Sequence, residues 1–213
     1  MSELALPSDT HRVELVSMDP HFHGISIALY QRRAEDGTAE FLVYSFSSKT
    51  GATKRVLFAA TAMRTLGGMV SSTQDPRFLR FDCGREHLLA CKRLFLEACK
   101  IEPDAPLEPR PMSTFDKRSE STIDIISEDD GRYRVTGQEG AERRVAVAAG
   151  GLVKLTDMEA LDDSMDRVGF DCHCSHDELV GLLLPRALNV RTVMREIELA
   201  TARGVLSAPS GQE

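Results

Sequence analysis

Residues 54–100 read KRVLFAATAMRTLGGMVSSTQDPRFLRFDCGREHLLACKRLFLEACK, and residues 143–189 read RRVAVAAGGLVKLTDMEALDDSMDRVGFDCHCSHDELVGLLLPRALN. A constant offset of 89 aligns the two stretches without a gap, and 12 of the 47 aligned positions are identical. Random pairing at average residue usage would give roughly three identities. We therefore interpret the chain as an internal duplication. The identical pairs include Arg55/Arg144, Leu66/Leu155, Phe81/Phe170, Asp82/Asp171, Cys83/Cys172 and His87/His176.

Each copy predicts a ββββα-like unit, with a mostly antiparallel sheet and a helix after the last strand. Hydrophobic runs between turn residues predict the strands, and Asp-Gly pairs suit the turn between the first two, because glycine accepts positive φ. In the closing helix of the first copy, apolar residues recur at spacings of three and four. The first three strands are expected at Ile25–Arg32, Glu40–Phe46 and Arg55–Ala59, and at Thr122–Ile126, Tyr133–Gly137 and Arg144–Ala148. The fourth strand should end at the Phe-Asp-Cys triplet of each copy.

These patterns predict an α+β fold in which the two units pack as a pseudo-twofold dimer. The first unit should span residues 11–101, with an added strand at His11–Met18. Residues 102–119 hold four prolines, which disfavour helix and central strand, so we expect an extended linker there. The second unit should span residues 120–204 and include an extra C-terminal helix at Val190–Arg203.

Composition limits the classes of function. The net charge is −7, and residues 1–105 are electrically balanced, so the acidic excess belongs to the remainder of the chain. An acidic balance makes nucleic acid an unlikely partner, because phosphate neutralisation dominates that affinity. No apolar run is long enough for a membrane helix, and the N-terminus has no secretion signal. Five cysteines without such a signal suit reduced thiols. We therefore expect a soluble cytoplasmic protein.

The repeated polar residues predict a metal site. Cys83 and His87, and again Cys172 and His176, occur at the same spacing where a strand gives way to a helix. If the two junctions pack side by side, these residues form a Cys2His2 set of the kind that zinc accepts in tetrahedral geometry. His173 and Cys174 would be additional ligands. The alternative is structural, with the cysteines filling equivalent core positions and the histidines starting the helices.

Two further sites remain open at this stage. Cys83 or Cys172 would act as a catalytic thiol if the helix N-terminus and the neighbouring histidine activated it. His21 and His23 share one face of an extended segment and form a usable pair of metal ligands, although a polar loop explains them equally well.

We expect a non-enzymatic binding or assembly protein, because no catalytic motif stands out. Its ligand, a small molecule or a protein of unknown identity, would bind at the junction of the two units, since a pseudo-dimer has one unique groove there. The alternative is a metal- or thiol-dependent enzyme that uses the duplicated Asp-Cys-x3-His junctions. The sequence leaves the biological process and the oligomeric state open.

Overall fold

The computed structural model describes residues 6–7, 9–17, 25–47, 51–103, 105–163 and 165–189. The described residues of the first half form five strands and two helices. These are β1 (His11–Ser17), β2 (Ser26–Arg33), β3 (Ala39–Tyr44), α1 (Ala52–Gly67), β4 (Met69–Ser71), β5 (Phe78–Phe81) and α2 (Leu88–Lys100).

The second half contains the same elements in the same order. They are β6 (Ser113–Asp116), β7 (Ser121–Ser127), β8 (Arg132–Gly137), α3 (Glu142–Leu155), β9 (Glu159–Ala160), β10 (Arg167–Gly169) and α4 (Asp177–Ala187). The strand orders of the two sheets correspond as well, being β1-β2-β3-β5-β4 and β6-β7-β8-β10-β9, and every strand pairing is antiparallel. The α+β class is confirmed, and each half has the order βββαββα.

The third predicted strand of each unit is wrong, because Arg55–Ala59 and Arg144–Ala148 lie inside helices α1 and α3. The short apolar run at these positions resembles a buried strand over only a few residues. Over the full length of α1 the buried residues recur at spacings of three and four, which is the helical period. Alanine, the strongest helix former, is frequent in both segments. The ββββα unit is therefore corrected to βββαββα, with short strands β4 and β9 added.

The segments flanking the repeat also differ from expectation in part. Residues 11–17 form strand β1, as predicted, and pair with β2. Strand β6 lies inside residues 102–119, the expected linker, and pairs with β7 in the position that β1 occupies in the first sheet. The predicted helix Val190–Arg203 lies outside the described residues.

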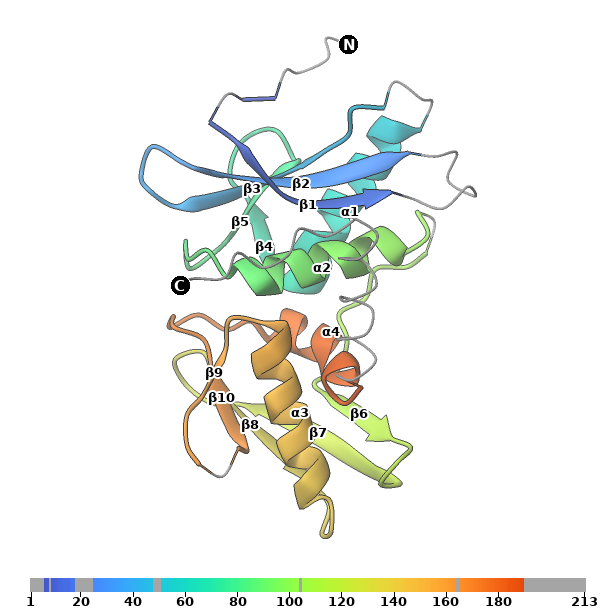
Figure 1. Ribbon diagram of the computed structural model, residues 1–213, viewed down its shortest axis with the longest axis vertical. Coiled ribbons are helices and arrows are strands. Elements are labelled where there is room, and N and C mark those ends of the chain that lie inside the picture. The colour runs from blue at the N-terminus through green and yellow to red at the C-terminus, as the bar shows by residue number, and fades with distance from the viewer. Residues whose placement is uncertain are drawn as a thin grey trace, which may run out of the picture.

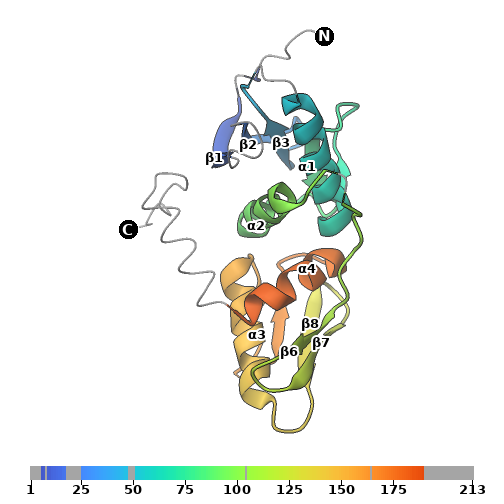
Figure 2. The same ribbon diagram turned by 90° about the vertical axis from the view of Figure 1, so that its right-hand side faces the viewer.

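Helices α2 and α4 lie between the two halves, whereas α1 runs along the first sheet and α3 along the second (Figure 1). Residues of all four helices share one apolar core with both sheets. Figure 2 shows α2 and α4 facing each other near the middle of the molecule. Contacts between α1 and α4 and between α2 and α3 cross from one half to the other. A single cluster of buried apolar side chains includes Phe41 and Leu94 of the first half and Leu152 and Leu183 of the second. None of the helices described is long and apolar enough to cross a membrane.

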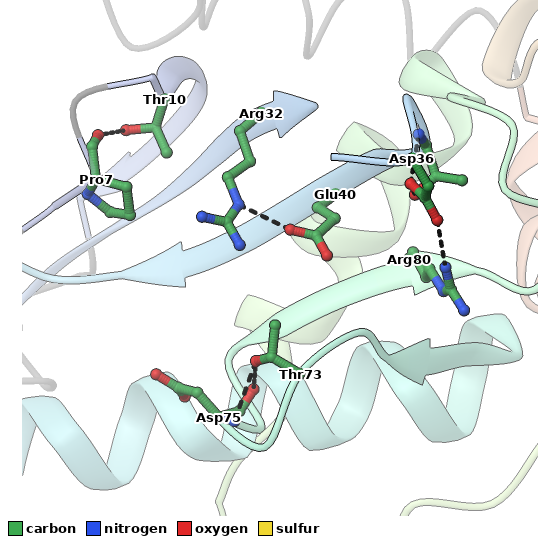
Figure 3. A network of polar contacts seen from close by, with 9 residues as sticks. Pro7, Thr10, Arg32, Asp36, Glu40, Thr73, Asp75 and Arg80 are labelled. Atoms are coloured by element: carbon green, nitrogen blue, oxygen red, sulfur yellow. Dashed lines mark hydrogen bonds and ion pairs between the residues drawn. The ribbon is translucent and has the colours of Figure 1, made fainter. Parts of the chain in front are cut away.

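The opposite face of the first sheet carries a polar network (Figure 3). Arg32 Nε donates to Glu40 Oε2 over 2.7 Å, and the Arg80 guanidinium lies 3.7 Å from the Asp36 carboxylate. The guanidinium of Arg32 also stacks 4.5 Å from the ring centre of Phe78. Charged side chains on this face satisfy one another, while the alternate residues of the same strands build the core.

Arg55 and Arg144, which are identical in the two aligned stretches, form hydrogen bonds with the C-terminal ends of helices α2 and α4. Arg55 donates from α1 to the backbone carbonyls of Cys99 and Ile101, at 2.5 and 2.7 Å. Arg144 donates from α3 to the carbonyl of Leu188 over 3.1 Å. Cys99 and Leu188 are themselves 89 residues apart. The same hydrogen bond therefore occurs in both halves, which explains why both aligned positions hold arginine. In each half the arginine binds backbone carbonyls that have no partner within the helix, because they lie at its end.

The ion pair between Arg144 and Asp116 predicts a loss of stability in acid. Hydrogen bonds from the Arg144 guanidinium, followed by those from Ser119 and the Arg118 backbone, lower the pKa of Asp116 to about 2. Because the folded pKa is below the unfolded one, the stabilisation is complete above about pH 4 and disappears as the pH falls toward 2. We expect Asp116→Asn to cost about 1–2 kcal/mol at pH 7, and less as the pH falls. Urea unfolding at pH 7 and pH 3 measures both values.

Asp124→Asn on strand β7 is the matched control, because the Asp124 carboxylate has no hydrogen bond or ion pair within the part of the chain described here. It should change stability by less than about 0.5 kcal/mol at either pH. If Asp116→Asn lost the same free energy of unfolding at both pH values, the ionised Asp116 carboxylate would not be the source of the stability.

Candidate metal centre

The site is built from two equivalent loops, each joining the last strand of a sheet to its closing helix. Residues 82–87 connect β5 to α2, and residues 170–176 connect β10 to α4. We call the region where these loops meet the seam. In the first loop Cys83 Sγ lies 3.2 Å from His87 Nε2, and in the second Cys172 Sγ lies 3.1 Å from His176 Nε2. Each loop therefore presents one thiol and one imidazole as a pair.

The structure brings these two pairs together. Cys83 Sγ lies 3.9 Å from Nε2 of His176, which belongs to the other loop. The ligand atoms of all four residues are within 4.8 Å of one another. Cys83, His87, Cys172 and His176 are the four residues for which the sequence predicted a shared site, so the packing that this prediction required is present.

The spacing of the four atoms suits a tetrahedral ion. Zinc binds cysteine sulfur at ~2.3 Å and histidine nitrogen at ~2.0–2.1 Å, so neighbouring ligand atoms in a regular tetrahedron lie about 3.4–3.8 Å apart. The three sulfur-to-nitrogen separations given above run from 3.1 to 3.9 Å and fall around this range. The other ligand atoms of the group are within 4.8 Å of one another, so side-chain shifts of up to about 1 Å would complete the geometry. The group could therefore hold a metal ion.

Aromatic rings surround the two imidazoles. The ring centres of His87 and His176 are 4.9 Å apart, with the planes nearly perpendicular. Phe81 lies 5.3 Å from His87 and 5.5 Å from His176, and Phe170 lies 4.9 and 4.7 Å from the same rings. His87 is 7% exposed and His176 is 3% exposed. These contacts keep water from the imidazoles and fix the orientation of both rings.

Burial prepares the histidines as ligands. Burial lowers the pKa of His87 to about 4, with help from the Arg85 charge, and lowers the pKa of His176 to about 4, with help from His87. Both imidazoles are therefore neutral near pH 7, as metal coordination requires. Burial raises the pKa of the Cys83 thiol, so without a cation this sulfur keeps its proton. A metal ion would replace that proton.

Two residues outside the group support the starts of the helices beside it. The hydroxyl of Tyr133, on β8, accepts a hydrogen bond of 2.7 Å from the backbone N–H of His176. The carboxylate of Asp157, which follows α3, accepts from the backbone N–H groups of Leu89 and Ala90 at the start of α2. Asp157 thus joins the second half to the first-half helix. Sequence analysis missed both residues, and neither position carried a signal that could have identified it.

Gly131 supports the second loop through its lack of a side chain. It has a φ of 68° in the β7–β8 hairpin, and its carbonyl accepts a hydrogen bond from the Phe170 N–H over 3.1 Å. A Cβ at this position would lie 2.5 Å from the Cys172 carbonyl oxygen and 3.1 Å from that of Cys174. The Asp-Gly turn was predicted from sequence, but its contact with the loop of residues 170–176 was not.

The remaining candidate ligands are not part of the four-residue group. His173 is exposed, and its Nδ1 lies 3.2 Å from a carboxylate oxygen of Asp130. Cys174 is half-buried in the same loop. His21 and His23 lie outside the described residues.

Comparison of the chain with known protein families, curated proteins and solved structures finds no match. The arrangement of these side chains is therefore the basis for assigning a function.

Replacing Gly131 tests its close packing against the loop of residues 170–176. We expect Gly131→Ala to cost roughly 3–4 kcal/mol, because it adds close contacts with the backbone of Cys172 and Cys174 to the strain of a positive φ. Gly37→Ala is the matched control. Gly37 is the hairpin glycine of the first half and has a φ of 81°, but its Cβ would meet no atom within 4 Å. It should lose only about 1 kcal/mol. Thermal unfolding measures both, and equal losses would disprove the proposed contact.

Replacing Tyr133 tests the hydrogen bond to His176. Tyr133→Phe removes the hydroxyl and leaves the buried N–H of His176 without its acceptor, which should cost about 1–3 kcal/mol. Tyr44→Phe removes the hydroxyl of another buried tyrosine, for which the described residues provide no hydrogen bond, and should change stability by less than about 0.5 kcal/mol. Urea unfolding of the two variants gives the comparison. A Tyr133→Phe protein as stable as the wild type would contradict the structural role.

Proposed function

We propose that the protein is a non-enzymatic, zinc-binding assembly protein in which one ion at the seam ties the two halves together. The observation that carries this proposal is the group of two thiols and two imidazoles, one of each from either half, within 4.8 Å. Thiolate and neutral imidazole are the ligands that zinc takes in structural sites. The partner or ligand of the protein would bind where the ion fixes the two loops relative to each other.

Reciprocal contacts support an internal duplication with pseudo-twofold packing. Phe81 contacts His176, and Phe170 contacts His87. Phe81 is equivalent to Phe170 and His87 to His176, so exchanging the two halves turns one contact into the other. Residues at a twofold axis meet their own equivalents. His87 meets His176 in this way, and Glu97 accepts from Arg186 over 3.2 Å. In both cases the partners are 89 residues apart.

The coordination favours a structural ion over a metal-dependent enzyme. A catalytic zinc keeps one position for water or substrate, whereas four protein ligands fill a tetrahedral shell. The buried imidazoles and the phenylalanine rings restrict access further. A thiol-dependent enzyme is also disfavoured, because a nucleophilic cysteine needs a lowered pKa, and burial raises the pKa of Cys83.

Metal analysis of the purified full-length chain tests the proposal. We expect about one zinc per chain, bound by two thiolates and two imidazoles. Substitution with cobalt(II) should give sulfur-to-cobalt charge-transfer absorption together with the visible bands of a tetrahedral ion. Removal of the metal with a chelator should lower the melting temperature, because an ion that binds only the folded state stabilises it by about 2.7 kcal/mol at a hundred times its dissociation constant.

Single substitutions separate the proposed ligands from their neighbours. Cys172→Ser and His87→Ala should each weaken cobalt(II) binding by roughly a hundredfold or more. His173→Ala and Cys174→Ser are the controls, since these side chains lie in the same loop but outside the group, and both should bind cobalt(II) like the wild type. Unchanged binding by Cys172→Ser, or a chain that takes up no zinc or cobalt, would rule out the proposed centre.

A further inference from the structure

The sulfur atoms and the imidazoles of the group differ in exposure. Cys83 and Cys172 are half-buried, whereas both imidazoles are almost fully enclosed. A small molecule that approaches from solvent therefore meets the thiols before the rings. Cys91 and Cys99 are buried in the core at 0% and 3% exposure, so a solvent-borne reagent does not reach them in the folded chain.

The two thiols also come from different halves of the chain. Their sulfur atoms are within 4.8 Å of each other, while a disulfide requires about 2.05 Å. Cys83 lies in a turn and Cys172 in a bend, so neither belongs to a helix or a strand. Closing the distance therefore takes side-chain rotation and movement of two loops that lie outside the helices and strands.

We propose that Cys83 and Cys172 form an oxidant-sensitive pair, in which hydroperoxide converts the two metal-binding thiols into a disulfide that crosslinks the halves. The release of metal in this step rests on the proposed function, whereas the formation of the disulfide rests only on the position of the two sulfurs. The ion and the disulfide are then two alternative links between the same two loops.

The chemistry balances with hydrogen peroxide as the only added oxidant. The zinc-loaded form supplies both sulfurs as thiolates, whereas in the metal-free form each thiol first gives its proton to solvent. One thiolate attacks a peroxide oxygen, so that an S–O bond forms, the O–O bond breaks and the hydroxide that leaves takes a solvent proton to become water. The second thiolate attacks the sulfur of this sulfenic acid, so that the S–S bond forms and the S–O bond breaks, and the hydroxide that leaves takes a second solvent proton to become water. Two electrons pass from the sulfurs to the peroxide. A metal ion loses both sulfur ligands and is left with two neutral imidazoles.

Cys174 is the competitor for this reaction. It is half-buried and lies only two residues from Cys172, whose Sγ is 4.0 Å from the Cys174 backbone oxygen. A disulfide between Cys172 and Cys174 would close a small ring within one loop and would leave the two halves unlinked. The identity of the crosslinked pair therefore distinguishes the proposed reaction from oxidation within the loop.

The experiment treats the full-length chain with hydrogen peroxide, in both the zinc-loaded and the metal-free forms. A chromogenic chelator follows zinc, thiol titration counts the remaining cysteines under denaturing conditions, and non-reducing peptide mapping by mass spectrometry identifies the linked pair. We expect the loss of two thiols per chain, the release of one zinc from the loaded form, and a crosslink between the peptides of Cys83 and Cys172. Reduction with dithiothreitol should restore both thiols and the capacity for zinc.

Variants and outcomes keep the two proposals separate. Cys174→Ser should still form the crosslink, whereas Cys83→Ser should lose it, and in both variants circular dichroism verifies that the chain remains folded. A crosslink between Cys172 and Cys174, or oxidation of single cysteines to sulfinic acid, would overturn the inference while leaving the zinc site intact. A crosslink in a chain that takes up no zinc would overturn the proposed function and retain the paired thiols.

Discussion

The structure around the seam depends on a pair of imidazoles buried against each other. Burying a polar ring is costly unless each nitrogen that loses water finds a partner. His87 and His176 cannot satisfy each other as two charged rings, because both are desolvated and like charges repel at a separation of 4.9 Å between ring centres. Both therefore stay neutral, and each Nε2 faces a sulfur. The need of each buried imidazole for a polar partner accounts for the cysteine four residues before each histidine, and the packing of the two imidazoles against each other brings the two loops together.

The two halves reach this arrangement by different local means. In the second half, the Tyr133 hydroxyl holds the His176 backbone, which has a φ of −126°. The sheet registers of the two halves place Phe41 at the corresponding position of the first half, and phenylalanine has no hydroxyl to offer. His87 instead has a φ of 37°, an uncommon conformation for a residue other than glycine. Asp157, reaching across from the other half, holds the start of α2. Equivalent side chains of the two halves are therefore positioned by different hydrogen bonds and backbone conformations.

The sequence predicted the four-residue group because of the repeat, not because of a motif. Cysteine and histidine four residues apart are a weak signal by themselves, and the repetition of Cys83 and His87 at an offset of 89 made the signal specific. The class of the fold followed from strands with clear turn chemistry. Arg55–Ala59 was misassigned because five residues cannot distinguish a strand from a helix that buries small side chains. Tyr133 and Asp157 could not be predicted, because each acts through a backbone group distant in the sequence.

The size of the core determines what a metal ion can do here. Small zinc-binding domains unfold without their ion, because they have too little apolar surface to fold alone. In this chain one continuous apolar cluster extends through both halves and joins the helices to both sheets. Folding therefore has a source of stability other than a metal, and an ion bound by the four residues would act locally on the position of residues 82–87 relative to residues 170–176. A link of this kind can be exchanged for another, since the surrounding core holds the two loops in register while the bonds between them change.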